Sequence, residues 1–222
     1  MRLGLHALGI GPGARRPVIE AVHDAGGLYI ADEVQPGFAR TGDSMWGFQR
    51  HGIVPDLVVM GKPMGNGMPI AGIAARPELL AEFGAKIRYF NTFGGNSVCV
   101  AAASAVLDVI EDEGLLDNSR VVGGALRDAV AGAARGNPRV RAVRGAGLYV
   151  AVEFADPETG EPDGPTALGI VNDMRDRRVL ISATGPHGNM LKIRPPLPFG
   201  LGQVDEFMAA FTPSLAALTD RS

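Results

Sequence analysis

The sequence predicts an α/β protein in which a mainly parallel sheet with helices is followed by a small α+β domain. Short apolar runs that suit buried strands alternate with helical patterns up to about residue 113. After residue 117 helices and short strands follow one another in series. Hydrophobic residues make up 46% and charged residues 20% of the 222 residues, which is typical of a globular chain with a sizeable core.

The first domain is expected to span residues 1–116. Its helices combine apolar stripes with terminal signals, such as the Gly26-Gly27 stop and Pro77 in a first turn. Its strands are short apolar runs. The sequence predicts helices over residues 15–25, 77–83 and 98–113, and strands over 28–31, 56–60 and 70–75.

The second domain is expected to span residues 117–222. A polar segment rich in Pro and Gly, residues 156–165, predicts a loop between its elements. The sequence predicts helices over residues 117–134, 166–177 and 203–218, and strands over 140–144, 148–154, 179–182 and 190–194.

Charge and composition narrow the classes of function. The net charge of −3 gives no basic excess for nucleic acid or an anionic membrane, and no run is long and apolar enough to span a bilayer. Residues 1–16 make a poor secretory signal, and the lone Cys99 fits a reducing cytoplasm. The four histidines lack metal-ligand spacing, so no metal site is expected.

A carboxylate and an amine follow two neighbouring apolar runs: Asp32 after residues 28–31, and Lys62 after residues 56–60. Ligands gather at the carboxyl ends of strands in open α/β sheets, so the pair indicates a functional site. A structural salt bridge or two solvated loop charges would explain the pattern equally well. Strand alternation turns Asp32 and Val34 to one face and Glu33 to the other, a surface that suits a flat aromatic cation.

Lys62 lies in a glycine-rich segment, residues 61–67, that invites comparison with a phosphate-binding loop. That motif requires a Gly five residues before the Gly-Lys pair and a Ser or Thr after the Lys. Asp56 and Pro63 occupy those positions, so the nucleotide-binding interpretation fails. A nucleophilic lysine on a tight loop remains, and burial would favour the neutral amine that this chemistry requires. The glycines at 9, 11 and 13 do not form a dinucleotide fingerprint and are interpreted as a loop.

Several long motifs together resemble one family in order and spacing. YIADEVQPGFARTG, PDLVVMGKPMGNGMPIAG and NTFGGNSVCVAAASAVLDVIEDEG begin at residues 29, 55 and 91. VRGAGLYVAVEF and LKIRPPLPF begin at residues 143 and 191. These segments resemble signatures of class III, fold type I aminotransferases, and the match runs from about residue 15 to the end. The resemblance implies the C-terminal part of the large domain followed by the small C-terminal domain.

The resemblance assigns roles to five residues. Lys62 would bind pyridoxal 5′-phosphate through a Schiff base, and Asp32 would hold the pyridine nitrogen protonated so that the ring acts as an electron sink. Val34 would pack on the ring, and Gln35 would hydrogen-bond near its phenolic oxygen. Thr92 would reach the cofactor phosphate of a partner subunit, which implies a homodimer. The implied reaction moves an amino group from an amino acid or amine to a keto acid or aldehyde.

The chain departs from the family in length. Family members carry about another half ahead of this segment, including a Gly-Ser/Thr loop that grips the cofactor phosphate. Neither that loop nor the aromatic residue over the cofactor is found in this sequence. We expect the chain alone to bind the cofactor poorly and to expose apolar sheet and dimer surface. An inactive remnant is therefore a further alternative.

The second departure concerns the substrate. Many family members have an arginine, a bidentate clamp for a carboxylate, three residues before the Pro-Pro-Leu motif. Lys192 occupies that position here, with Arg194 directly before the prolines. Lysine is a point charge rather than an equivalent clamp, and Lys192 would serve equally well as a surface residue. The segment resembles the branch of alanine-glyoxylate aminotransferases and amino-alcohol-phosphate phospho-lyases, so elimination of phosphate is an alternative reaction.

Overall fold

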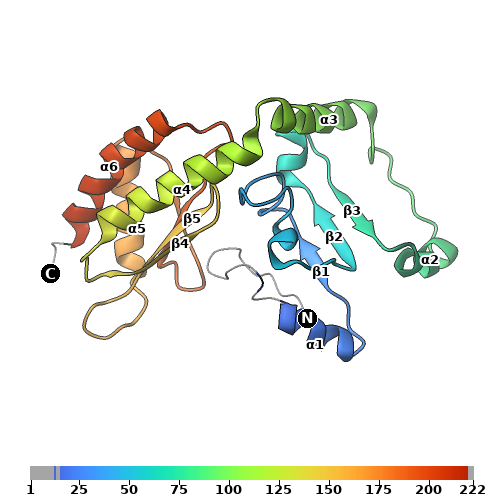
Figure 1. Cartoon of the computed structure of the whole chain (residues 1–222), viewed down its shortest axis with the longest axis horizontal. Helices are drawn as coiled ribbons and strands as arrows, with labels where there is room; N and C mark the ends of the chain where they lie inside the picture. The colour runs from blue at the N-terminus through green and yellow to red at the C-terminus, as the bar shows by residue number, and fades with distance from the viewer. Residues whose placement is uncertain (1–12, 14–15, 220–222) are drawn as a thin grey trace. The chain divides into compact units, whose positions relative to one another are not determined.

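The computed structural model describes residue 13 and residues 16–219, and the chain divides into two compact units, residues 1–116 and 117–222 (Figure 1). The remainder of the expected glycine loop at residues 9–13, and nearly all of residues 1–16, lie outside the described range. Within that range no helix is long and apolar enough to cross a bilayer.

Unit 1 follows the predicted order of helices and strands, with two 3₁₀ turns, η1 and η2, that the sequence pattern did not reveal. Asn96 caps the long helix α3 by accepting the N–H of Cys99 at 3.0 Å. The elements are α1 (Arg16–Asp24), β1 (Ile30–Asp32), η1 (Gly47–His51), β2 (Leu57–Met60), η2 (Lys62–Gly65), β3 (Gly72–Ala75), α2 (Pro77–Lys86) and α3 (Ser97–Asp112).

The three strands of unit 1 form one sheet in the order β1-β2-β3 (Figure 1). β1 and β2 run parallel, whereas β3 runs antiparallel to β2. The expectation of a mainly parallel sheet is thus correct for one of the two strand pairs in the described part of this unit. β3 runs antiparallel to β2 because the connection from Met60 to Gly72 is short. Two consecutive parallel strands require a crossover connection of about a dozen or more residues.

In the described part of unit 2 there are three helices and a four-stranded antiparallel sheet with the order β4-β5-β7-β6. The strand expected at residues 179–182 begins only at Ser182, which pairs with Lys192, and Leu180 is 84% exposed. The apolar run of residues 179–181 lies before the paired part of this edge strand. The elements are α4 (Leu115–Ala134), β4 (Val140–Gly145), β5 (Val150–Phe154), α5 (Gly164–Asp176), β6 (Ser182–Thr184), β7 (Met190–Ile193) and α6 (Leu201–Thr219).

The core of unit 2 lies between one face of this sheet and the helices α4, α5 and α6. Alternation along β5 directs Val150, Val152 and Phe154 into the core, and all three are fully buried. On α6, the rings of Phe207 and Phe211 stack with centroids 5.5 Å apart. This core fixes β7, the strand that precedes the Pro-Pro-Leu motif.

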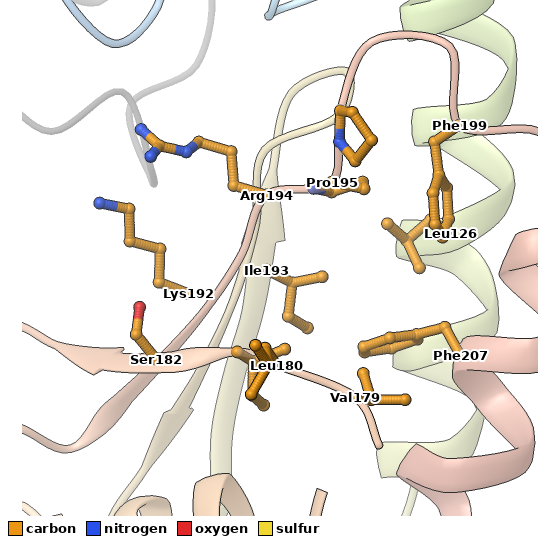
Figure 2. Close-up of a pocket in the computed structure, with 12 residues that line it drawn as sticks. Leu126, Val179, Leu180, Ser182, Lys192, Ile193, Arg194, Pro195, Phe199 and Phe207 are labelled. Atoms are coloured by element: carbon orange, nitrogen blue, oxygen red, sulfur yellow. The ribbon is translucent and has the colours of Figure 1, made fainter. Parts of the chain in front are cut away.

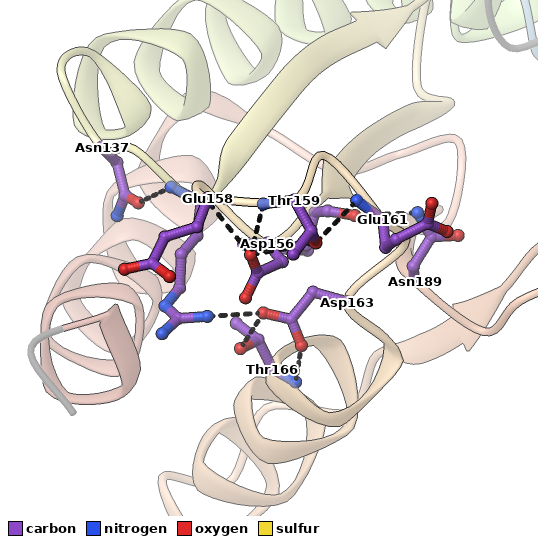
Figure 3. Close-up of polar contacts among 10 residues, drawn as sticks. Asn137, Asp156, Glu158, Thr159, Glu161, Asp163, Thr166 and Asn189 are labelled. Carbon is purple, nitrogen blue, oxygen red and sulfur yellow. Dashed lines mark hydrogen bonds and ion pairs between the residues drawn. The ribbon is translucent and has the colours of Figure 1, made fainter. Parts of the chain in front are cut away.

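A polar network fixes the loop between β5 and α5 (Figure 3). Asp163 caps α5 by accepting the N–H of Thr166 at 3.0 Å, and Arg139 donates to its second oxygen at 2.9 Å. Burial raises the pKa of Asp163, but the hydroxyl and N–H of Thr166, together with Arg139, outweigh burial and hold that pKa below the usual 3.8. Asp156 closes the neighbouring turn by accepting the N–H of Thr159 at 2.8 Å. The predicted polar loop is therefore an ordered one.

Candidate active site

Asp32 and Lys62 follow neighbouring parallel strands at the same edge of the unit 1 sheet. Asp32 is the last residue of β1 and is the register partner of Val59 on β2. Lys62 comes three residues after Val59, directly beyond Met60 and Gly61. Because adjacent strands lie about 4.8 Å apart, this register brings the carboxylate and the amine to one end of the sheet. The parallel register of β1 and β2 thus agrees with the expectation that the two residues follow neighbouring strands.

The backbone at Lys62 is strained. Lys62 has φ 44°, in the left-handed region that non-glycine residues seldom adopt. It begins the 3₁₀ turn η2, in which the Met64 N–H donates to the Gly61 carbonyl at 3.2 Å, and Asn66 ends the turn with φ 44°. The helix α3 packs against η2. Strain of this kind persists where the surrounding structure enforces it, and it occurs frequently at functional sites.

The Lys62 side chain is exposed in the described part of the chain. Asp32 is exposed as well, and its Oδ1 accepts the N–H of Val34 at 3.2 Å. Among the described residues no ion pair joins Asp32 to Lys62. A structural salt bridge therefore does not explain why these two charges occur at one sheet edge.

Val34 and Gln35 continue from Asp32 into the loop after β1. The alternation of exposed Asp32, buried Glu33 and half-buried Val34 agrees with the expected facing of these side chains. A β-carbon placed on Gly61 would lie 3.9 Å from Val34 Cγ2, so Val34 lies against the residue that precedes Lys62. This valine presents apolar surface beside the backbone of the lysine turn.

Thr92 lies exposed in the connection between α2 and α3, within a turn built by two asparagines. Asn91 Oδ1 accepts the N–H groups of Phe93 and Gly94 at 3.2 and 3.0 Å. Asn96 Nδ2 donates to the Phe93 carbonyl at 2.9 Å. These bonds give the Thr92 segment a defined shape on the surface of unit 1.

Lys192 and Arg194 belong to unit 2 and share one face of β7 and its extension. Figure 2 shows both side chains extending to one side, whereas Ile193 points toward Leu126 and Phe207. They border a cavity of about 350 Å³ whose other walls are mainly apolar. A pocket with an apolar floor and two cations at its edge suits an organic anion.

Two buried carboxylates of unit 1, Asp56 and Glu33, are not among the site residues that the sequence predicts. Asp56 is 6% exposed at the start of β2, where its Oδ2 accepts the Tyr29 N–H at 2.6 Å and lies 2.8 Å from His23 Nε2. Its Oδ1 lies 2.8 Å from Arg76. Burial raises the pKa of Asp56, but the bonds from Tyr29 and His23 and the charges of His23 and Arg76 outweigh burial and lower that pKa from 3.8. This network fixes the strand that leads to Lys62.

The second of these carboxylates is Glu33, 2% exposed, which accepts two backbone N–H groups of η1. The signal in the sequence was the position of Glu33 between Asp32 and Val34. Strand alternation turns Glu33 to the opposite face from its two neighbours, toward the interior. Its partners are 14 and 15 residues away in sequence, and no local pattern identifies them.

Comparisons with known proteins agree with this fold. Residues 16–215 match the family model described as aminotransferase class-III. The chain is 42% identical to the alanine–glyoxylate aminotransferase 2-like protein of Drosophila melanogaster, over 90% of this chain and 41% of that protein. It is 40% identical to the ethanolamine-phosphate phospho-lyase homolog 1 of Caenorhabditis elegans, over 88% of this chain and 43% of that protein.

A solved phospholyase from Arthrobacter, in complex with phosphoethanolamine, superposes with a TM-score of 0.87 and 43% identity, over 92% of this chain and 49% of that one. The α/β fold with a Lys62-bearing sheet edge is that of part of a fold type I pyridoxal-phosphate-dependent enzyme. The chain belongs to the class-III aminotransferase family. It spans about half the length of the relatives that it matches.

Proposed function

We propose that the protein acts as a pyridoxal-phosphate-dependent aminotransferase and that this chain supplies the lysine and the carboxylate of the active site. The observation that carries the proposal is the parallel register of β1 and β2, which sets Asp32 and Lys62 at one sheet edge. Membership of the class-III aminotransferase family supports it. Because the chain spans about half of its relatives, the complete active site includes polypeptide beyond the segments described above.

The residues at this edge fit the ring of pyridoxal phosphate. The exposed carboxylate of Asp32 is available to a ring N–H, and Val34 offers apolar surface next to Gly61. Gln35, half-buried beside Val34, is the proposed partner of the phenolic oxygen. Lys62 supplies the amine for covalent attachment. The proposed cofactor-binding residues of this chain are Lys62, Asp32, Val34, Gln35 and Thr92.

The proposed chemistry uses the amine of Lys62 and the carboxylate of Asp32. When bound, pyridoxal phosphate supplies an electron sink for negative charge on the amino-bearing carbon of the substrate. Lys62 would hold the cofactor through its Nζ, and its free amine would serve as the general base that moves a proton at the amino-bearing carbon of the substrate. The carboxylate of Asp32 would accept a hydrogen bond from the ring N–H and keep that proton on the nitrogen. The proposed substrates are an amino donor and a keto or aldehyde acceptor.

We infer a homodimer in which Thr92 donates a hydrogen bond to the cofactor phosphate held by the partner subunit. The defined turn at Asn91–Asn96 supports this role, because it presents Thr92 at the surface. Large apolar side chains are exposed on both sides of Thr92, with Phe90 at 82% and Phe93 at 80% exposure. An exposed apolar patch of this kind marks a surface that is covered in an assembly.

Lys192 and Arg194 are the proposed anchors for an anionic group of the substrate. A phospho-lyase is the second candidate function, because two cations on one face of β7 suit a phosphate as well as a carboxylate. The matched phospho-lyase relatives support this alternative. Formation of pyridoxamine phosphate and a keto product would establish transamination, whereas release of inorganic phosphate and ammonia would establish elimination.

We also propose a cytoplasmic location. Cys99 is the one cysteine of the sequence and lies buried and unpaired in α3, which agrees with a reducing compartment. Fractionation of source cells with an antibody against the chain would test the location. Recovery with sealed organelles would contradict it.

Covalent trapping tests the proposed role of Lys62. The sequence contains three lysines, Lys62, Lys86 and Lys192, so a reduced cofactor adduct is readily mapped. The purified chain is incubated with pyridoxal phosphate, reduced with borohydride and analysed by peptide mass spectrometry. Because reduction is irreversible, it accumulates even a weakly bound cofactor, so we expect the adduct on Lys62, its loss in Lys62→Ala and its retention in Lys86→Ala. An adduct distributed over all three lysines, or none at all, would favour a remnant that does not bind the cofactor by itself.

A further inference from the structure

We infer that Glu33 is a positioning residue: its buried carboxylate closes the loop of residues 33–48 and thereby fixes Asp32, Val34 and Gln35. The expected effect of Glu33 on cofactor binding rests on the proposed function, because those three residues are the proposed cofactor contacts. The closure of the loop rests on the contacts of Glu33 alone.

Glu33 joins the two ends of this loop, which is named the 33–48 loop. Its Oε2 accepts the N–H of Gly47 at 2.7 Å, and its Oε1 accepts the N–H of Phe48 at 2.8 Å. These are the first two N–H groups of η1, which have no acceptor within the turn. Both carboxylate oxygens are therefore used, and the side chain is 2% exposed. Loss of the carboxylate would leave two N–H donors without their acceptor.

The backbone of Glu33 ties the same residue to the sheet and to the loop. Its N–H donates to the Val59 carbonyl on β2 at 2.9 Å, and its carbonyl accepts the Gly37 N–H at 3.1 Å. Glu33 thus links β2, the beginning of the loop and the end of the loop. Asp32 precedes it and Val34 follows it, so a displacement of Glu33 moves both neighbours.

The interior of the 33–48 loop is tightly packed and strained. Phe38 and Ala39, both buried, have φ 58° and 65°. A β-carbon on Gly37 would lie 2.9 Å from Trp46 Cε3, and one on Gly47 would lie 2.6 Å from Pro36 Cβ. Strained non-glycine residues persist only when the surrounding structure enforces them. The bonds of the Glu33 carboxylate supply part of that enforcement.

The loop contains its own spectroscopic probe. Trp46 is the single tryptophan of the sequence, and its ring meets Phe38 edge to face with centroids 5.0 Å apart. Its fluorescence reports the closure of the 33–48 loop without any cofactor. Amide hydrogen exchange at residues 34–37 reports whether the proposed cofactor contacts are held in place.

The test compares Glu33→Gln with Glu153→Gln in the full 222-residue chain. Glu33→Gln preserves the size of the side chain but turns an amide group toward one of the two N–H donors. Glu153→Gln removes a partly buried carboxylate of unit 2 that pairs with Arg144. It controls for the loss of a carboxylate charge outside the 33–48 loop. Gly47→Ala is a second way to open the loop, because its new methyl group meets Pro36.

We expect Glu33→Gln and Gly47→Ala to shift the Trp46 emission to longer wavelength and to accelerate amide exchange at residues 34–37. Their far-UV circular dichroism stays that of the wild type, and Glu153→Gln leaves both loop signals unchanged. Affinity for pyridoxal phosphate falls about tenfold in the two loop variants, with Lys62 and Asp32 both intact.

Three results would overturn the inference. In the first, the emission of Trp46 is the same in Glu33→Gln and the wild type. In the second, exchange accelerates only at Gly47 and Phe48, which would make Glu33 a cap for η1 and nothing more. In the third, the wild type binds the cofactor and Glu33→Gln binds it equally well. A wild-type chain that binds no cofactor would count against the proposed function of the chain, and the fluorescence and exchange results would still decide the role of Glu33.

Discussion

Asp32 on β1 is the register partner of Val59 on β2, and Lys62 follows Val59 by three residues. This pairing places two charges that are 30 positions apart in sequence at the same end of a sheet.

Replacement of Asp32 by Asn tests the role of the carboxylate in the active protein. The amide has no charge to keep a ring nitrogen protonated, so we expect kcat/KM for transamination to fall about 100-fold or more. The fold is retained, because Asp32 is exposed. Steady-state kinetics beside circular dichroism provide the measurement. Asp24→Asn, also exposed in unit 1 but outside the 33–48 loop, is the matched control, and equal activity of the two variants would exclude the proposed role.

The exposed aromatic side chains next to Thr92 predict self-association. Phe93→Asp introduces a charge where an apolar surface would be covered, so we expect the dimer to dissociate into monomers. Sedimentation velocity over a range of concentrations measures the change. Thr92→Ala should leave the dimer intact and weaken only cofactor binding. A wild-type chain that remains monomeric at high concentration would refute the proposed interface.

The Asp56 network predicts acid sensitivity of unit 1. The pKa of Asp56 is lower in the folded state than the ordinary 3.8, so its contribution to the free energy of unfolding is complete above that value. The contribution is lost as pH falls through the lowered pKa. Asp56→Asn should therefore destabilise the protein by about 2 kcal/mol at pH 7 and by less at pH 3. Urea unfolding at both pH values measures this difference, and an equal loss at both would contradict it.

A large cavity in the core of unit 2 should destabilise that unit strongly. Phe154 is fully buried between the sheet and the helices, and Phe154→Ala should cost about 3–5 kcal/mol. Amide exchange resolved by segment measures the effect in residues 117–219. Leu180→Ala is the control, since this leucine is 84% exposed and should change stability by less than about 0.5 kcal/mol.

The cations on β7 predict a selective loss of substrate affinity. Lys192→Ala and Arg194→Ala should each raise the KM for an anionic substrate about tenfold and leave kcat for a neutral amine unchanged. Arg178→Ala, another exposed cation of unit 2, is the control. Equal KM values in all three variants would show that Lys192 and Arg194 are surface residues only.

The sequence by itself determined much of this protein. Periodicity and terminal signals located most helices and strands, including α3 and β5. The order and spacing of long motifs indicated the family, which the comparisons confirmed. The apolar runs before Asp32 and Lys62 indicated a site at the strand ends. A strand end is visible in the sequence itself, as a short apolar run followed by a polar residue.

Only the tertiary structure decided how these elements combine. It paired β1 with β2 in parallel, turned β3 antiparallel and left residues 179–181 outside β6. It also brought Glu33 to Gly47, and Asp56 to His23 and Tyr29. A buried carboxylate takes as partners the donors that the folded chain brings within about 3 Å, and those donors lie far along the sequence. Periodicity records which face of an element is buried, but it does not record which distant groups meet there.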